Sequence, residues 1–322
     1  MPPAPPQLDE HGFPIPSTFD DRPARRGPSR AFQFVWRTAL VLACIAVVLG
    51  WAFQSRLANG AKNWLAEQLV RRSLEKVLLN DPSGALGDLN RAASLSPDNP
   101  QVLQIRAQLK LTLHDVEGSL EDYNALVKLD RRYAPAYLGR SSALQRLNRH
   151  REAIDDLTQA IKLSTSRDAT PHNNRAYARA IAGVDLAEAL DDVQEAIKII
   201  DEDLRDNQLA NRRSLTQAPE LKGQKAAYLD TRGYIYFLQS RYEEALADLD
   251  QAIQFAEEFH GLRVGHIRAE YQPYFKKQSD QEMSVMYHHR GQVYEKLGRN
   301  EEARADLDRA TQLGYNPAEG VF

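Results

Sequence analysis

The stretch "TRGYIYFLQSRYEEALADLDQAI", Thr231–Ile253, places Arg232 beside a glycine and Asp248 sixteen residues further on, inside an apolar helical pattern. Small and apolar residues recur at intervals of three or four, which is typical of an amphipathic helix: Ala245, Leu249 and Ala252. Two interpretations are open for the arginine and the aspartate. They form a functional charge pair, or they belong to a scaffold.

The same pattern recurs along the chain at a fixed interval, with a period of about 34 residues. The segments GALGDLNRAASL, GSLEDYNALVKL and EAIDDLTQAIKL follow one another at this interval. Each copy predicts two amphipathic helices joined by a turn, and inserts near 204–225 and 260–283 interrupt the period. The copies start near Ala66, Pro100, Ala134, Ala169, Ala226 and Ser284. Six copies of one helical hairpin predict an all-α array in which each copy packs against its neighbours.

An arginine and an aspartate occupy the same two positions in every copy. The arginines are Arg72, Arg106, Arg140, Arg175, Arg232 and Arg290, and the aspartates are Asp88, Asp122, Asp156, Asp192, Asp248 and Asp306. A catalytic pair is needed once, whereas a pair present in every copy serves what every copy does, which is packing helix against helix. We expect each pair to form a charge-assisted contact, between the two helices of a copy or between adjacent copies. We interpret the pairs as structural.

The copies "YLDTRGYIYFLQSRYEEALADLDQAI" and "YHHRGQVYEKLGRNEEARADLDRA" resemble the tetratricopeptide repeat family. Its motif is a helix-turn-helix of about 34 residues, with small residues where the helices cross. The resemblance covers residues 66–317 apart from the inserts. It implies a right-handed superhelical solenoid of six repeats, with a concave groove lined by the first helices. The sequence departs from the family at Lys76, Lys110 and Arg179, where an aromatic residue is usual.

The last copy differs from the others where a further copy would pack. Two positions that are apolar in the earlier copies hold Arg304 and Thr311 in the last. A polar outer face closes a repeat array. We therefore expect the sixth copy to form its own cap, with nothing packed beyond Leu313.

The resemblance implies that a peptide or protein segment binds in the groove. Certain eukaryotic members clamp an acidic chaperone tail with lysine, asparagine and arginine, but the clamp is absent here because those positions hold residues such as Val70 and Leu138. The expected groove residues are Gln101, Gln104, Gln108, Arg146, Asn173, Tyr177, Asp230, Tyr234, His288 and Gln292. Their amides and aromatic rings favour polar contacts to a peptide backbone.

The sequence favours no enzyme, cofactor or metal site. It lacks the HExxH, P-loop lysine, GxGxxG and GxSxG motifs. His288 and His289 are adjacent and point about 100° apart on a helix, so they do not form a chelating pair. A net charge of −3 without a basic patch disfavours nucleic acid. An enzyme with its site in an insert remains an alternative.

The part of the chain before the repeats has a different composition. Residues 1–30 hold half of the 16 prolines and predict a disordered tail. Residues 31–54 predict a transmembrane helix, because the run from Ala39 to Phe53 has no charge and its extension to Phe32 is long enough to cross a bilayer. A cleaved signal peptide and a buried core helix are the alternatives. Residues 55–65 predict a helical connector.

Arginines precede the apolar span, which favours a cytoplasmic N-terminus and a repeat array on the far, periplasmic side. They are Arg22, Arg25, Arg26 and Arg30. We therefore expect a single-pass membrane protein of the bacterial envelope type that acts as a non-enzymatic scaffold. The alternative is a protein like a mitochondrial import receptor, with its array in the cytosol.

Overall fold

The computed structural model describes residues 11, 48, 56, 59–165, 167–209, 218–264 and 267–316. The predicted tail and membrane span lie outside the described residues, apart from residues 11 and 48. Within the described ranges, no helix is both long and apolar enough to cross a membrane. The chain divides into two units, Met1–Asn59 and Gly60–Phe322, and helices α2 to α12 belong to the second.

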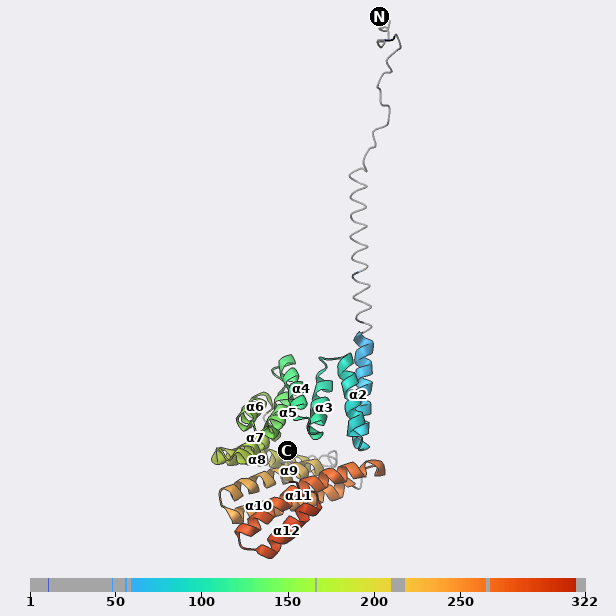
Figure 1. Ribbon diagram of the computed structural model, residues 1–322. Coiled ribbons are helices and arrows are strands. Elements are labelled where there is room, and N and C mark those ends of the chain that lie inside the picture. Colours follow the sequence, from blue (N-terminus) through green and yellow to red (C-terminus); the bar gives the residue numbers. More distant parts are fainter. Residues whose placement is uncertain are drawn as a thin grey trace. The chain divides into compact units, whose positions relative to one another are not determined.

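All regular structure in the described ranges is helical, and the helices form pairs joined by tight turns (Figure 1). The first pair is a helix over residues 59–78 with α2 (Pro82–Leu95). The other pairs are α3 (Pro100–Thr112) with α4 (Val116–Leu129), α5 (Ala134–Arg146) with α6 (His150–Leu163), α7 (Thr170–Ala182) with α8 (Leu186–Leu209), α9 (Ala218–Leu238) with α10 (Tyr242–Val264), and α11 (Gln272–Lys296) with α12 (Asn300–Gln312). Each predicted copy is thus one helix pair, and the expectation of an all-α array is confirmed.

Local sequence sets where the helices begin. Helices α2, α3, α5, α7 and α11 carry a proline in their first turn, where the missing N–H is not needed. The side chains of Asp81, Asn99 and Asp115 accept hydrogen bonds from the first backbone N–H groups of α2, α3 and α4. These caps satisfy donors that a helix end would otherwise leave unpaired.

The turn inside each pair contains a residue with a left-handed backbone. These residues and their φ angles are Asn80 (61°), His114 (63°), Asn148 (56°), Gly183 (65°), Ser240 (60°) and Gly298 (73°). The turn of the fourth pair contains a second, Asp185, with φ of 48°. Glycine adopts this conformation at no steric cost, and asparagine tolerates it better than most residues. The left-handed residue reverses the chain, so that the second helix of each pair packs back on the first.

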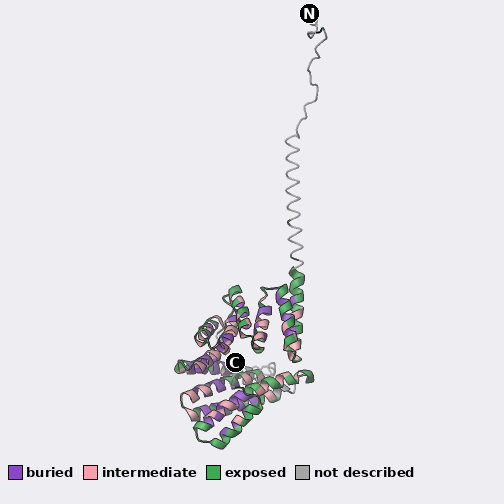
Figure 2. Ribbon diagram, in the orientation of Figure 1, coloured by how far each residue is buried: buried purple, intermediate pink, exposed green. Residues whose placement is uncertain are grey.

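The core is distributed along the array. Each helix from α2 to α12 contacts the next one along the chain. Small residues such as Ala85, Ala153 and Ala245 are fully buried at these contacts and let the helices approach closely. Figure 2 shows buried residues on all the helix pairs instead of in one centre. Each copy is therefore stabilised mainly by its neighbours.

The two predicted inserts mostly lengthen helices. The described part of 204–225 belongs to the end of α8 and the start of α9. The described part of 260–283 belongs to α10, α11 and the short 3-10 helix η1 (Ala269–Tyr271).

The described end of the array has a polar outer face. Arg304 is 86% exposed in its side chain, Thr311 is exposed, and no described helix follows α12. No described helix covers Arg304 and Thr311, as expected of a sixth copy that forms its own cap. The chain beyond Leu313 returns to the first helix of the same copy, where the ring of Tyr315 stacks on His288 with 4.0 Å between centroids. Gly314, with φ of 91°, allows the chain to turn back toward α11.

Candidate functional site

In all six copies the arginine binds the aspartate of the same copy with two nitrogen atoms. Nε donates to one carboxylate oxygen over 2.6 to 2.8 Å, and Nη2 donates to the other. The aspartates are 3 to 7% exposed. This forked geometry fixes the relative position of the two helices, because both partners are held at two points.

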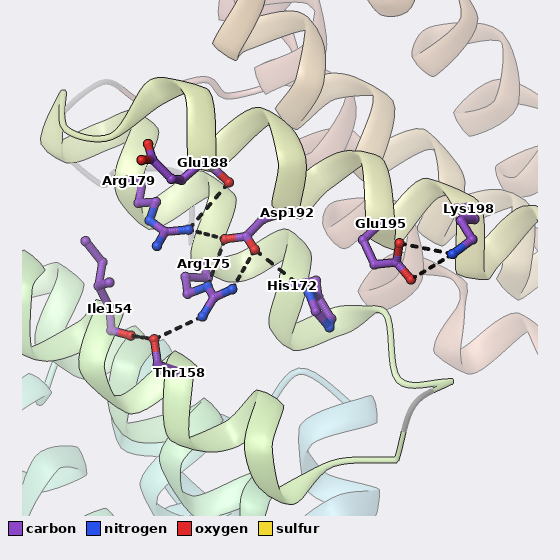
Figure 3. Close-up of polar contacts among 9 residues, drawn as sticks. All are labelled: Ile154, Thr158, His172, Arg175, Arg179, Glu188, Asp192, Glu195 and Lys198. Carbon is purple, nitrogen blue, oxygen red and sulfur yellow. Dashed lines mark hydrogen bonds and ion pairs between the residues drawn. The ribbon is translucent and has the colours of Figure 1, made fainter.

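The same arginines also connect adjacent copies. The third nitrogen, Nη1, of Arg175 donates to Oγ1 of Thr158 in α6 over 3.1 Å (Figure 3). Nη1 of Arg140 donates to Asn124 over 3.0 Å, and Nη1 of Arg290 donates to Asp250 over 2.8 Å. In these copies one guanidinium therefore contacts side chains of two other helices. The same group stabilises both the helix pair of its own copy and the packing against the preceding copy.

The positions that depart from the family pattern hold a second cation for the aspartate. Lys76 lies 2.8 Å from a carboxylate oxygen of Asp88, and Lys110 lies 3.0 Å from one of Asp122. Arg179 donates to Asp192 in the same way (Figure 3). In the fifth and sixth copies the position holds a tyrosine, which lies under a guanidinium instead.

The cations lower the pKa of two of these aspartates, Asp88 and Asp192. The hydrogen bond from Arg72 lowers the pKa of Asp88 to about 2, against the opposing effect of burial. Burial raises the pKa of Asp192, but the hydrogen bonds from Arg175 and the nearby side chains of His172 and Arg179 outweigh it, so the pKa lies below its ordinary value. The charge pairs are thus part of the packing between helices, and binding must be sought in residues that differ from copy to copy.

The ten expected groove residues lie on the first helices of the pairs, namely α3, α5, α7, α9 and α11. Helix α3 contacts α5, α7 contacts α9, and α9 contacts α11. We call this row of helices the first-helix face. The residues on it fall into two groups.

The first group lies on α3 and α5. Gln101 and Gln104 line a cavity of about 400 Å³, and Gln104 accepts a hydrogen bond from the Tyr133 hydroxyl over 2.5 Å. The rest of the cavity lining is Asn99, Pro100, Leu126, Leu129, Asp130 and Tyr133. Gln108 is exposed, and Arg146 donates to the backbone carbonyl of Leu111 over 3.2 Å, which links α5 to α3.

The second group joins three successive copies. Tyr177 on α7 lies 6.4 Å from Tyr234 on α9, between ring centroids, and Tyr234 stacks on His289 of α11 at 4.5 Å. The ring of His288 lies 6.3 Å from that of His289 and stacks on the ring of Tyr315. We call these five residues the aromatic cluster. Tyr177, Tyr234, His288 and Tyr315 are half-buried, so each keeps part of its surface open to solvent.

Two expected groove residues lie below the surface. Asp230 is 7% exposed and its carboxylate lies 2.9 Å from Nδ1 of His289. Asn173 is also buried, and its Oδ1 has no hydrogen-bond partner among the described residues. The close approach of α7, α9 and α11 covers both side chains. Gln292, by contrast, is half-buried on α11.

The exposed part of the aromatic cluster is uncharged at neutral pH. Burial, and to a smaller extent His289, lower the pKa of His288 to about 4, so that its ring is neutral. Burial, with the negative charge of Asp230 nearby, raises the pKa of Tyr177. The cluster therefore offers rings and hydroxyl groups to a ligand instead of a charge.

Two members of the aromatic cluster, His289 and Tyr315, are not among the groove residues predicted from the sequence. His289 was weighed only as a metal ligand, and it lies one residue before the structural Arg290. Tyr315 follows the last position of the sixth repeat, so comparison of the copies predicts nothing about its location. Among the described residues, no group of three or more histidine, cysteine, aspartate or glutamate side chains is placed to hold a metal ion.

Family models match parts of the repeat array. Three family models, each described as tetratricopeptide repeat, match residues 138–203, 226–267 and 285–313. These ranges fall on the third to sixth helix pairs.

The chain is also similar to several known proteins. It is 25% identical over 219 residues to DnaJ homolog subfamily C member 3 of Gallus gallus, a match covering 64% of this chain and 40% of that protein's length. A thermophilic TPR protein of Thermus thermophilus is 23% identical, with a TM-score of 0.46, over 65% of this chain and 98% of the other. BtubC (BKLC) from P. vanneervenii is 16% identical, with a TM-score of 0.48, over 74% and 92% of the two chains.

Proposed function

We propose that this chain, a tetratricopeptide repeat protein, is a non-enzymatic scaffold that binds a peptide or protein segment along its first-helix face. Proteins of this family mediate protein–protein interactions. The observation that carries the proposal is the aromatic cluster, which three successive copies build from residues that do not recur at the same position in every copy. Residues required by packing recur in every copy, as the arginine–aspartate pairs do.

The chemistry of the cluster favours one kind of ligand. Tyrosine rings dominate binding hot spots because they bury a large apolar area and still offer a hydroxyl group. Since the exposed rings are neutral, we expect them to take an apolar or aromatic side chain of the partner. Half-buried amides such as Gln292 can bond to the backbone of an extended segment.

Truncation of the tyrosines tests this proposal. We expect Tyr177→Ala and Tyr234→Ala each to weaken partner binding at least about tenfold, which is the size of a moderate hot-spot loss. The measurement is quantitative affinity capture with the full chain, with a thermal unfolding scan of each variant to show that it is folded. Tyr242→Ala, on the second helix α10, is the matched control and should bind as the wild type does. Unchanged binding in both tyrosine variants would show that the partner does not bind at the aromatic cluster.

We further propose that residues 31–54 anchor the array in a membrane, with the N-terminus in the cytoplasm. The uncharged run from Ala39 to Phe53 and the arginines before it support this. Protease added to intact bacterial spheroplasts digests a C-terminal tag if the array is periplasmic and leaves the tag intact if the array is cytoplasmic. We expect digestion. Protection of the tag in intact spheroplasts, with digestion only after lysis, would contradict this proposal and place the array in the cytoplasm.

A further inference from the structure

The first helix of the array, over residues 59–78, exposes large apolar side chains on its outer side, among charged ones. Its inner face packs on α2 through Ala66 and Val70, which are almost completely buried. On its outer side Trp64 is 61% exposed and Leu74 is 45% exposed. In Figure 2 this helix, which packs beside α2, carries exposed residues along its length. A single exposed apolar residue is ordinary on a protein surface. A tryptophan and a leucine exposed on the same side of one helix are a stronger indication of a binding surface.

The outer residues follow the spacing of a helix-pairing seam. Trp64, Glu67, Arg71 and Leu74 are separated by three, four and three residues, which places them on one stripe of the helix, and all four are exposed. We call these four residues the outer stripe. It contrasts with the other end of the array, where the exposed positions hold Arg304 and Thr311.

We propose that the outer stripe is a self-association surface that pairs antiparallel with the outer stripe of a second copy of this chain. With the two-fold axis at the level of Leu69, Trp64 faces Leu74 of the second copy and Glu67 faces Arg71. Symmetry repeats each contact, so two charge pairs lie between two apolar contacts. This inference is independent of the ligand of the first-helix face. With the membrane span proposed above, it requires the paired helices to lie along the membrane surface, because antiparallel pairing brings the two spans in at opposite ends of the pair.

The order of residues in the outer stripe favours a second copy over other occupants. Read from either end, the stripe is apolar, charged, charged, apolar, with charges of opposite sign at the two inner positions. An antiparallel second copy, which has the same order, satisfies all four positions at once. A pair of helices is a small interface, so we expect a reversible dimer.

Disulfide cross-linking tests the register. In a Cys44→Ser background, full chains carrying Trp64→Cys and full chains carrying Leu74→Cys are purified in mild detergent, mixed and oxidised. We expect a covalent dimer in the mixture at several times the yield of either variant alone, because only unlike positions face each other. Mixing Trp64→Cys with Glu121→Cys, an exposed residue of α4, is the matched control. Equal yields in all mixtures, or none, would overturn the proposal.

Charge reversal tests the pairing without altering the apolar residues. Glu67→Arg and Arg71→Glu should each weaken dimerisation at least about tenfold, because each places like charges opposite one another. The double variant Glu67→Arg/Arg71→Glu should restore it, since the exchanged charges again face opposite partners. Sedimentation velocity of the full chain in detergent measures the monomer–dimer equilibrium. Failure of the double variant to recover, with circular dichroism showing intact helices, would overturn the charge-paired seam. Equal self-association of all variants would do so as well.

Discussion

Replacing Asp192 with alanine is expected to lower the free energy of unfolding by about 3–5 kcal/mol. Asp192 is 7% exposed and accepts hydrogen bonds from both Arg175 and Arg179, which are themselves largely buried. The substitution removes the acceptor and leaves two guanidinium groups in a poorly solvated site. Among the residues drawn in Figure 3, no other carboxylate group lies between the two arginines. The loss is therefore larger than that of an exposed ion pair, which is about 0–1 kcal/mol.

Urea unfolding followed by circular dichroism measures this loss. Asp191→Ala is the matched control, because Asp191 is the exposed neighbour on the same helix. It should change the free energy of unfolding by less than about 0.5 kcal/mol. A loss below about 1 kcal/mol for Asp192→Ala would show that the repeated pairs contribute little to holding the helices together.

Gly233→Ala is expected to lower the free energy of unfolding by about 1–3 kcal/mol. A Cβ at this position would lie 2.8 Å from Cγ of Leu249 and 3.2 Å from the carbonyl oxygen of Ala245. Leu249 and Ala245 are fully buried, so neither can move without disturbing the contact between α9 and α10. In an exposed helix the same substitution would stabilise, since alanine has the higher helix propensity.

Gly87→Ala supplies the matched control for this prediction. Gly87 is exposed on α2, and a Cβ there meets nothing within 4 Å. We expect it to raise the free energy of unfolding by about 0.5–1 kcal/mol. Opposite signs for the two variants, measured in the same urea titration, would confirm that Gly233 is needed for helix packing. Stabilisation by both would show that α9 and α10 have room to adjust.

The repeat period was enough to predict the helix pairs, because each pair is specified locally by its apolar spacing, its caps and its turn. The contact between Arg232 and Asp248 was predictable for a different reason: both residues recur in every copy. The contacts of the second cations with these aspartates were not predictable from the sequence. Lys76 and Arg179 look like departures from the repeat, and only the folded geometry shows that they reach the aspartate of their own copy.

The candidate site was predicted less completely. Tyr177, Tyr234 and His288 were selected and do lie on neighbouring first helices. Asp230 was expected on the surface, but the depth of a side chain depends on how closely three helices approach, which a single sequence does not specify. Tyr315 lies outside the repeat frame, and its position on His288 depends on the reversal of the chain at Gly314.

Binding along the first-helix face is tested most directly by site-specific photo-cross-linking in living cells. A photoreactive amino acid replaces Gln292 on the first helix α11 in one full-length variant and Gln159 on the second helix α6 in another. We expect a discrete protein adduct from position 292, its loss when Tyr234→Ala is added, and no such adduct from position 159. An adduct from position 159 alone, or one from position 292 that persists with Tyr234→Ala, would contradict binding at the aromatic cluster.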